Sequence, residues 1–226
     1  RLDNKPLQQV LRNKIREFFP YGSLWVVFHI HIDYFKVFAY LAGLVSIYSA
    51  LKQTRFSNNI ASAILSFFWM WTGVVFCIFY WAPMYPAAYA FGALLTAQGL
   101  VFLLSAAKPT LSFGTRRNQF TLIGALFVAY AMVGYPLLGY FFGRVYPQSI
   151  PFGLAPCPTS VFTFGLFMLT NKRIPTYVLV IPVIWSICAI VPIISGIYED
   201  AGLLLAGIVC TPMLLRRDKP NPSIGS

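Results

Sequence analysis

Charged residues are scarce in this sequence. They make up 10% of the 226 residues, and six acidic residues stand against 17 lysines and arginines. A typical soluble domain has about a quarter of its residues charged. With 58% hydrophobic residues and a mean hydropathy of +0.69, the chain has too few polar side chains to cover a surface that faces water. We therefore expect lipid to surround most of it.

Metal ligands and catalytic motifs are scarce as well. The two histidines, His29 and His31, lie on one segment, and the four cysteines have neither metal nor redox spacing. This excludes a zinc hydrolase and a haem held by histidines from two helices. Residues 201–215 hold no lysine for a retinal, and the sequence has no phosphate-binding glycine loop and no nucleophile elbow. We therefore predict no catalytic residues and no metal, and the cofactor stays unknown.

Long apolar stretches dominate the remaining sequence. A spanning helix needs about 20 apolar residues, and seven stretches qualify or come close: 33–51, 60–81, 86–107, 119–142, 157–171, 174–194 and 200–215. The sequence predicts an all-α protein, an integral membrane bundle of about seven transmembrane helices. Its domain would span 33–215, between an N-terminal arm at 1–32 and a basic tail at 216–226.

Basic residues divide unequally between the connections. If all seven stretches cross, one side receives ten of them, and the other side's connections (82–85, 143–156 and 195–199) hold only Arg144. By the positive-inside rule, the first side is cytoplasmic, so the C-terminus is cytoplasmic and the N-terminus lies outside. The ten residues are Lys52, Arg55, Lys108, Arg116, Arg117, Lys172, Arg173, Arg216, Arg217 and Lys219.

The N-terminal arm departs from this rule, because it is basic and lies outside. Its apolar residues follow helical spacing, which predicts an amphipathic helix on the outer membrane surface. They are Leu7, Val10, Leu11, Ile15, Phe18 and Phe19. The segment from Leu24 to Ile32 is too short to cross and should extend the first helix outward. The net charge of +11 then reflects topology and contact with the lipid bilayer, and gives no reason to expect nucleic acid.

Polar side chains in or beside spanning helices are costly to bury, so each is a candidate for function. His29, Asp33 and Lys36 share one face of the first helix, where they are candidates for binding an ion or relaying protons. The alternative is an Asp33–Lys36 pair at the membrane surface. Gln98, near the middle of the third stretch, is expected to make an interhelical polar contact. Glu199 and Asp200 lie where the seventh helix begins, and we interpret Asp200 as its cap.

The segment 150–160 is the most informative. Its three prolines should prevent regular helix before about Thr159, and Thr159 and Ser160 are good capping residues. A helix from there to Asn171 rises only about 20 Å, less than the roughly 30 Å hydrocarbon core. Nonhelical backbone should therefore enter the membrane, enclosed by the outer ends of the first and sixth helices. It would form either a site for a solute or a packed plug.

Three segments carry a resemblance to a known family. They are Phe152 to Leu169 with its Ala155-Pro-Cys-Pro-Thr159 element, Val180 to Ser186, and Asp200 to Gly207. Over roughly the last 80 residues the chain resembles an uncharacterised family of small bacterial polytopic membrane proteins, a domain of unknown function. The resemblance implies a bacterial inner membrane and about seven helices, and brings no activity or ligand.

Two classes of function follow from these observations. The first is a non-catalytic accessory or structural subunit of a larger membrane complex, with membrane-protein partners. The alternative is a transporter or channel for a small solute or ion, with its site at the broken fifth helix. Candidate ligand or proton residues are His29, Asp33, Lys36, Thr159 and Ser160. An intramembrane enzyme ranks third, because no nucleophile and base can be paired.

Overall fold

The computed structural model describes residues 21–52, 54–108, 110–114, 119–144 and 152–217, with the backbone alone for 21–34. All the regular elements among these residues are helices, with one isolated β-bridge between Phe113 and Thr170, which agrees with the predicted all-α class. The elements are α2 (Tyr21–Leu51), α3 (Ser57–Met70), the π-helix η1 (Trp71–Trp81), α4 (Ala88–Ala107), α5 (Gln119–Ala129), the π-helix η2 (Tyr130–Gly134), α6 (Tyr135–Phe141), α7 (Pro156–Met168), α8 (Thr176–Cys188), α9 (Ile190–Ile194), the short 3-10 helix η3 (Tyr198–Asp200) and α10 (Ala201–Arg216).

Five of the helices are long and apolar enough to cross a membrane. They are Ser57–Trp81, Ala88–Ala107, Gln119–Phe141, Thr176–Ile194 and Tyr198–Arg216. Over the described residues, the predicted first and fifth crossings do not meet this criterion of length and apolarity. The part of α2 with described side chains, Phe35–Leu51, is a shorter apolar helix, and α7 has 13 residues. Seven crossings therefore stay a prediction.

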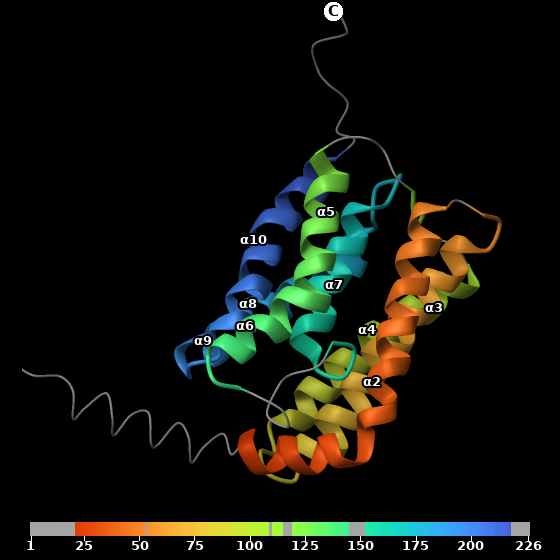
Figure 1. Cartoon of the computed structure of the whole chain (residues 1–226). Helices are drawn as coiled ribbons and strands as arrows, with labels where there is room; N and C mark the ends of the chain where they lie inside the picture. Colours follow the sequence, from red (N-terminus) through yellow and green to blue (C-terminus); the bar gives the residue numbers. More distant parts are fainter. Residues whose placement is uncertain (1–20, 53, 109, 115–118, 145–151, 218–226) are drawn as a thin grey trace, which may run out of the picture.

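The first helix is longer than its apolar stretch. The segment from Leu24 to Ile32 belongs to α2, which has 31 residues, so the prediction that it continues the first helix is confirmed. It does not run straight outward, however. The first part of α2, red in Figure 1, lies across one end of the bundle before the helix turns along it. The predicted amphipathic helix of residues 1–20 lies outside the described residues.

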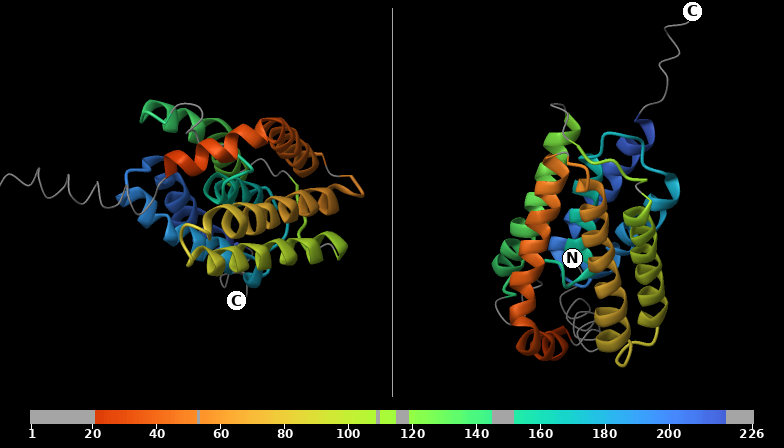
Figure 2. Two further views of the ribbon diagram at one scale, coloured as in Figure 1. Left: turned by 90° about the horizontal axis from the view of Figure 1, so that it is seen from below. Right: turned by 90° about the vertical axis from the view of Figure 1, so that its right-hand side faces the viewer.

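The short helix α7 forms the centre of the bundle. All its residues except Cys157 are buried, and it packs against α3, α5, α8 and α10. Viewed end-on, α7 lies among the other helices (Figure 2, left). Because α7 is covered by protein, its length need not match the thickness of the hydrocarbon core.

The helix α7 begins at Pro156, three residues before the expected start near Thr159. The expectation was wrong because proline is well tolerated in the first turn of a helix, where its missing N–H would have no helical partner. The prediction that the preceding turn is enclosed by protein is confirmed. Phe152 has no exposed surface, and its ring packs against Tyr40 of α2, Phe68 of α3 and Phe162 of α7, at centroid distances of 5.6, 5.4 and 4.8 Å.

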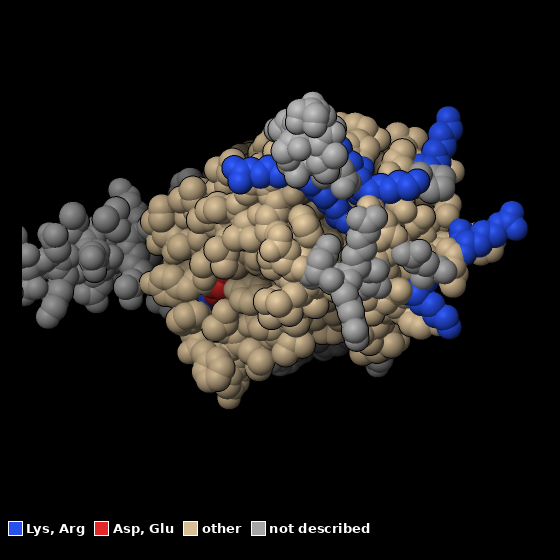
Figure 3. Space-filling model, turned by 90° about the horizontal axis from the view of Figure 1, so that it is seen from above, with Lys and Arg blue, Asp and Glu red and all other residues tan. Residues whose placement is uncertain are grey.

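Basic residues gather at one end of the bundle, which we call the basic end. It comprises the α2–α3, α4–α5 and α7–α8 connections and the end of α10 (Figure 1). Lysine and arginine side chains surround this face in Figure 3. The described ones in these segments are Lys52, Arg55, Lys108, Lys172, Arg173, Arg216 and Arg217. We call the other end, with the η1–α4, α6–α7 and α9–α10 connections, the far end.

Candidate functional site

A buried group of charges lies at the far end. Glu199 and Asp200, the last residues of η3, are each 1% exposed. The guanidinium of Arg144, which follows α6, donates from Nε to Oε1 of Glu199 at 2.7 Å, and its Nη2 pairs with Oε2. Its Nη1 also donates to the carbonyl of Gly196 at 3.2 Å. Two parallel bonds of this kind fix a guanidinium and a carboxylate in one geometry.

Two tyrosines complete this group. Tyr130 of η2 donates its hydroxyl to the backbone carbonyl of Glu199 at 2.6 Å, and the hydroxyl of Tyr135 donates to Oδ1 of Asp200. Asp200 occupies the N-cap position of α10, as the sequence indicated, but its side chain makes no capping hydrogen bond. Its carboxylate points toward the bundle interior and accepts the hydrogen bond from Tyr135.

The sequence contained part of the evidence for this buried group of charges. Arg144 was the single basic residue among the outer connections, and Glu199 and Asp200 were the acidic residues of a later one. The pairing was missed because 55 residues separate Arg144 from Glu199. Neither periodicity nor spacing along the chain predicts which connections meet.

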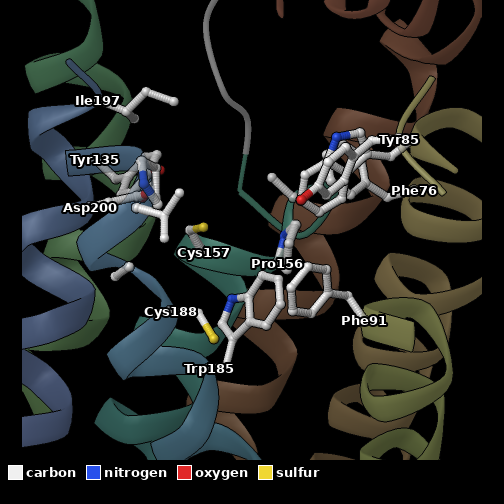
Figure 4. A pocket seen from close by; sticks show the side chains of 15 residues that line it. Phe76, Tyr85, Phe91, Tyr135, Pro156, Cys157, Trp185, Cys188, Ile197 and Asp200 are labelled. Atoms are coloured by element: carbon white, nitrogen blue, oxygen red, sulfur yellow. The ribbon is translucent and has the colours of Figure 1, made fainter. Parts of the chain in front are cut away.

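Beside these charges lies a cavity of about 190 Å³. One side of it is formed by aromatic side chains from three elements and a connection, which we call the aromatic wall: Phe76 and Trp81 of η1, Tyr85 of the η1–α4 connection, Phe91 of α4 and Trp185 of α8. Tyr135 and Asp200 line the other side, with Pro156 and Cys157 of α7 between them (Figure 4).

The aromatic wall is continuous. The Trp81 ring stacks on Tyr85 and on Phe91, both at centroid distances of 5.9 Å, and lies 6.2 Å from Phe76. Phe91 meets Trp185 edge to face at 5.6 Å. Such pairs stabilise one another beyond the area they bury, so the wall is a preformed surface.

Polar atoms at the cavity are few. Cys157 lies beside Asp200 and Trp185. Trp185 is 5% exposed, and its indole Nε1 makes no hydrogen bond of ordinary geometry within the part of the chain that the structure describes. A buried indole N–H usually has a partner. The cavity thus combines apolar walls with the carboxylate of Asp200, the thiols of Cys157 and Cys188, and the indole N–H of Trp185.

Of the candidate ligand residues predicted from the sequence, none of those with described side chains lines this cavity. The side chains of His29 and Asp33 lie outside the described residues, and Lys36, on α2, does not line the cavity. Thr159 and Ser160 are buried in α7, and their hydroxyls donate to the carbonyls of Ala155 and Pro156, both at 2.7 Å. They bond back along the helix, so the capping role expected for them is wrong.

Gln98 makes the interhelical contact that the sequence predicted. Its side chain is fully buried in α4, and its Nε2 donates to the carbonyl of Val178 in α8 at 3.1 Å. Among the residues with described side chains, no group of three or more histidines, cysteines or acidic residues is placed to hold a metal ion.

A family model described as Family of unknown function (DUF6064) matches residues 26–222. The chain belongs to this family. Its match extends far upstream of the last 80 residues, over which the sequence suggested a family of unknown function, and includes every residue of the cavity. Among curated proteins and among solved structures, none matches the chain. The family assigns no activity, so function has to be argued from the cavity and its neighbours.

Proposed function

We propose that this chain is a non-catalytic multi-pass membrane protein that binds a small organic molecule in the far-end cavity. The observation that carries the proposal is the cavity itself, about 190 Å³ with an aromatic wall and a carboxylate at its edge. Ligand sites are typically concave and mainly apolar, with a few polar groups that fix orientation. Of the functions considered from the sequence, a transporter or channel with a solute site at the start of the fifth helix comes nearest to this cavity.

The cavity has the size for a small aromatic or branched aliphatic group. An apolar protein cavity of about 150 Å³ stays dry and binds benzene. Among the described residues, the cavity walls come from seven elements, η1, α4, α6, α7, α8, α9 and η3. A bound molecule would therefore hold several parts of the bundle together.

The proposed location is the bacterial inner membrane, with the basic end in the cytoplasm and the cavity on the outer side. The apolar composition and the five helices able to span a bilayer support a membrane protein. The gathering of basic residues at one end supports this orientation. Solute would then enter from the outer face or from the outer leaflet.

The test uses neopentylbenzene, a neutral probe, and a variant that fills the cavity. Ala189 lines the cavity and is 2% exposed, so Ala189→Phe should occupy the space. Ala90→Phe places the same ring on an exposed position of α4 and serves as the matched control. We expect the probe to raise the melting temperature of the wild type and of Ala90→Phe, because a ligand that binds the folded state stabilises it.

Ala189→Phe should fold and show no such shift. An equal shift in all three proteins would show that the probe binds elsewhere, and the absence of any shift in the wild type would contradict the proposal.

An accessory subunit is the second candidate. The observation that favours it is the strip of exposed apolar side chains along α2: Val37, Phe38, Leu41, Leu44, Val45 and Tyr48. A strip of this kind packs against lipid or against a partner helix. Native mass spectrometry of the protein released from its own membrane separates the two. A stoichiometric protein partner that is lost in Leu41→Ser with Leu44→Ser supports a subunit, and a monomer argues against it.

A further inference from the structure

The cavity also indicates what kind of molecule it binds. Building on the proposed function, we infer that the ligand carries an organic ammonium group, held between the aromatic wall and the carboxylate of Asp200. The inference depends on three features: the charge balance of the buried group, the π faces of the wall, and the apolar remainder of the cavity.

The buried charges do not balance when Asp200 is ionised. Arg144 forms its ion pair with Glu199, which leaves that pair neutral. No lysine or arginine among the described residues forms an ion pair with Asp200, whose carboxylate accepts from the hydroxyl of Tyr135. With both carboxylates ionised, Arg144, Glu199 and Asp200 together carry one uncompensated negative charge. A buried charge without a partner is costly, so a cation in the cavity would be stabilised there.

The aromatic wall provides the second feature, the π faces that can bind an organic ammonium group. The face of an aromatic ring is electron-rich and attracts a cation, with tryptophan the strongest, and quaternary ammonium groups are recognised by cages of aromatic rings. The Trp81 ring lies nearly parallel to Tyr85 and to Phe91, offset at 5.9 Å from each, and Phe76 and Trp185 flank this group. In Figure 4, Phe76, Tyr85 and Phe91 lie across the cavity from Asp200 and Tyr135.

The remaining walls favour an organic cation over a metal ion. They are mainly carbon atoms, from Ala155, Pro156, Ala189, Val191, Pro192 and Ile197. A hard metal ion needs about six oxygen ligands to replace its water. An alkylammonium has a diffuse charge and an apolar surface, so carbon and π faces can solvate most of it while one carboxylate balances the charge.

The experiment compares two probes of the same shape. Benzyltrimethylammonium and neopentylbenzene differ by the replacement of N⁺ with carbon, so their affinities separate charge from size. Binding is measured by titration calorimetry on the purified full chain. We expect the cation to bind the wild type about tenfold more tightly than the neutral probe.

Asp200→Asn should abolish that difference, and a cooperative thermal unfolding transition shows that this variant folds. Asp200→Glu should retain a preference for the cation. Phe91→Leu keeps an apolar side chain but removes a π face, and should weaken binding of the cation more than that of the neutral probe.

The outcomes distinguish the inference from the proposed function. Equal binding of both probes to the wild type, or an undiminished preference in Asp200→Asn, would overturn the ammonium inference and leave ligand binding standing. If neither probe binds, both are overturned. Free amines and lipid headgroups share this chemistry, so the titration is repeated in phosphatidylglycerol nanodiscs with and without phosphatidylcholine. A weaker apparent affinity with phosphatidylcholine assigns the site to a lipid headgroup, and an unchanged one assigns it to a free ammonium compound.

Discussion

At the scale of single residues, the far end depends on a small number of buried polar contacts. Glu199 is 1% exposed, while the side chain of its partner Arg144 is 21% exposed. Removing one partner of a buried ion pair leaves the other charge without compensation, and this costs more than the pair itself contributes.

The variant Arg144→Ala should therefore lower the free energy of unfolding by about 3 kcal/mol, the lower end of the usual range because Arg144 is partly exposed. Neutralising the remaining carboxylate as well, in Arg144→Ala with Glu199→Gln, should recover most of that loss. Chemical unfolding in mild detergent measures both. Arg173→Ala, at an exposed position of the basic end, is the control and should change little. A double variant no more stable than Arg144→Ala would contradict this view of the pair.

At this scale, the sequence predicted a contact correctly when a single residue was enough to indicate it. Gln98 was singled out because an amide in the middle of an apolar stretch needs a partner on another helix, and it bonds to Val178 of α8. Tyr135, Cys157 and Trp185 were not singled out, because aromatic and cysteine residues are ordinary in apolar helices. Their relation to Asp200 arises from the packing of α6, α7, α8 and η3, which no local pattern contains.

At the scale of elements, α7 is the part on which the others assemble. It approaches α5 closely through two glycines. A Cβ added at Gly165 would lie 2.9 Å from the carbonyl oxygen of Gly124 and 2.7 Å from the side chain of Val128. The absence of a side chain at Gly165 is therefore what lets the two backbones meet.

Gly165→Ala should force α5 and α7 apart and cost about 1–3 kcal/mol, the usual effect of overpacking. Ala125→Leu adds more atoms to α5 but at an exposed position, and should leave stability nearly unchanged. The melting temperature in detergent measures both variants. If Gly165→Ala were as stable as the wild type, α7 would not be packed as described.

The sequence predicted the elements better than their ends. The apolar stretches correctly predicted the long helices. The prolines correctly indicated that the turn leading into α7 is enclosed by protein. The start of α7 at Pro156 was missed because proline fits the first turn of a helix. The π-helices η1 and η2 were not predicted either. A π-helix is set by one additional residue per turn, for which periodicity gives no signal, yet η1 supplies Phe76 and Trp81 to the cavity.

At the scale of the whole molecule, the arrangement of charge favours the proposed orientation. The basic connections lie at the basic end, and Arg144 at the far end is paired with Glu199. An arginine held in an ion pair does not oppose the orientation that the basic end favours.

Labelling of single cysteines should confirm this orientation. Met84→Cys, in the far-end connection after η1, should react with an impermeant maleimide from outside, and Thr110→Cys, in the α4–α5 connection, should react only from the cytoplasm. Both positions are exposed. Reaction of the wild type, with its four native cysteines, gives the background. Labelling of both positions from the same side would refute the orientation.

The central claim is that the far-end cavity binds a small molecule, and locating a bound probe tests it most directly. The measurement is the anomalous diffraction of bromine in crystals of the protein grown with 4-bromobenzyltrimethylammonium. We predict a bromine peak inside the cavity between Phe91, Trp185 and Asp200, absent in crystals of Ala189→Phe. A peak outside the cavity, or none at a concentration that saturates binding in solution, would contradict the claim.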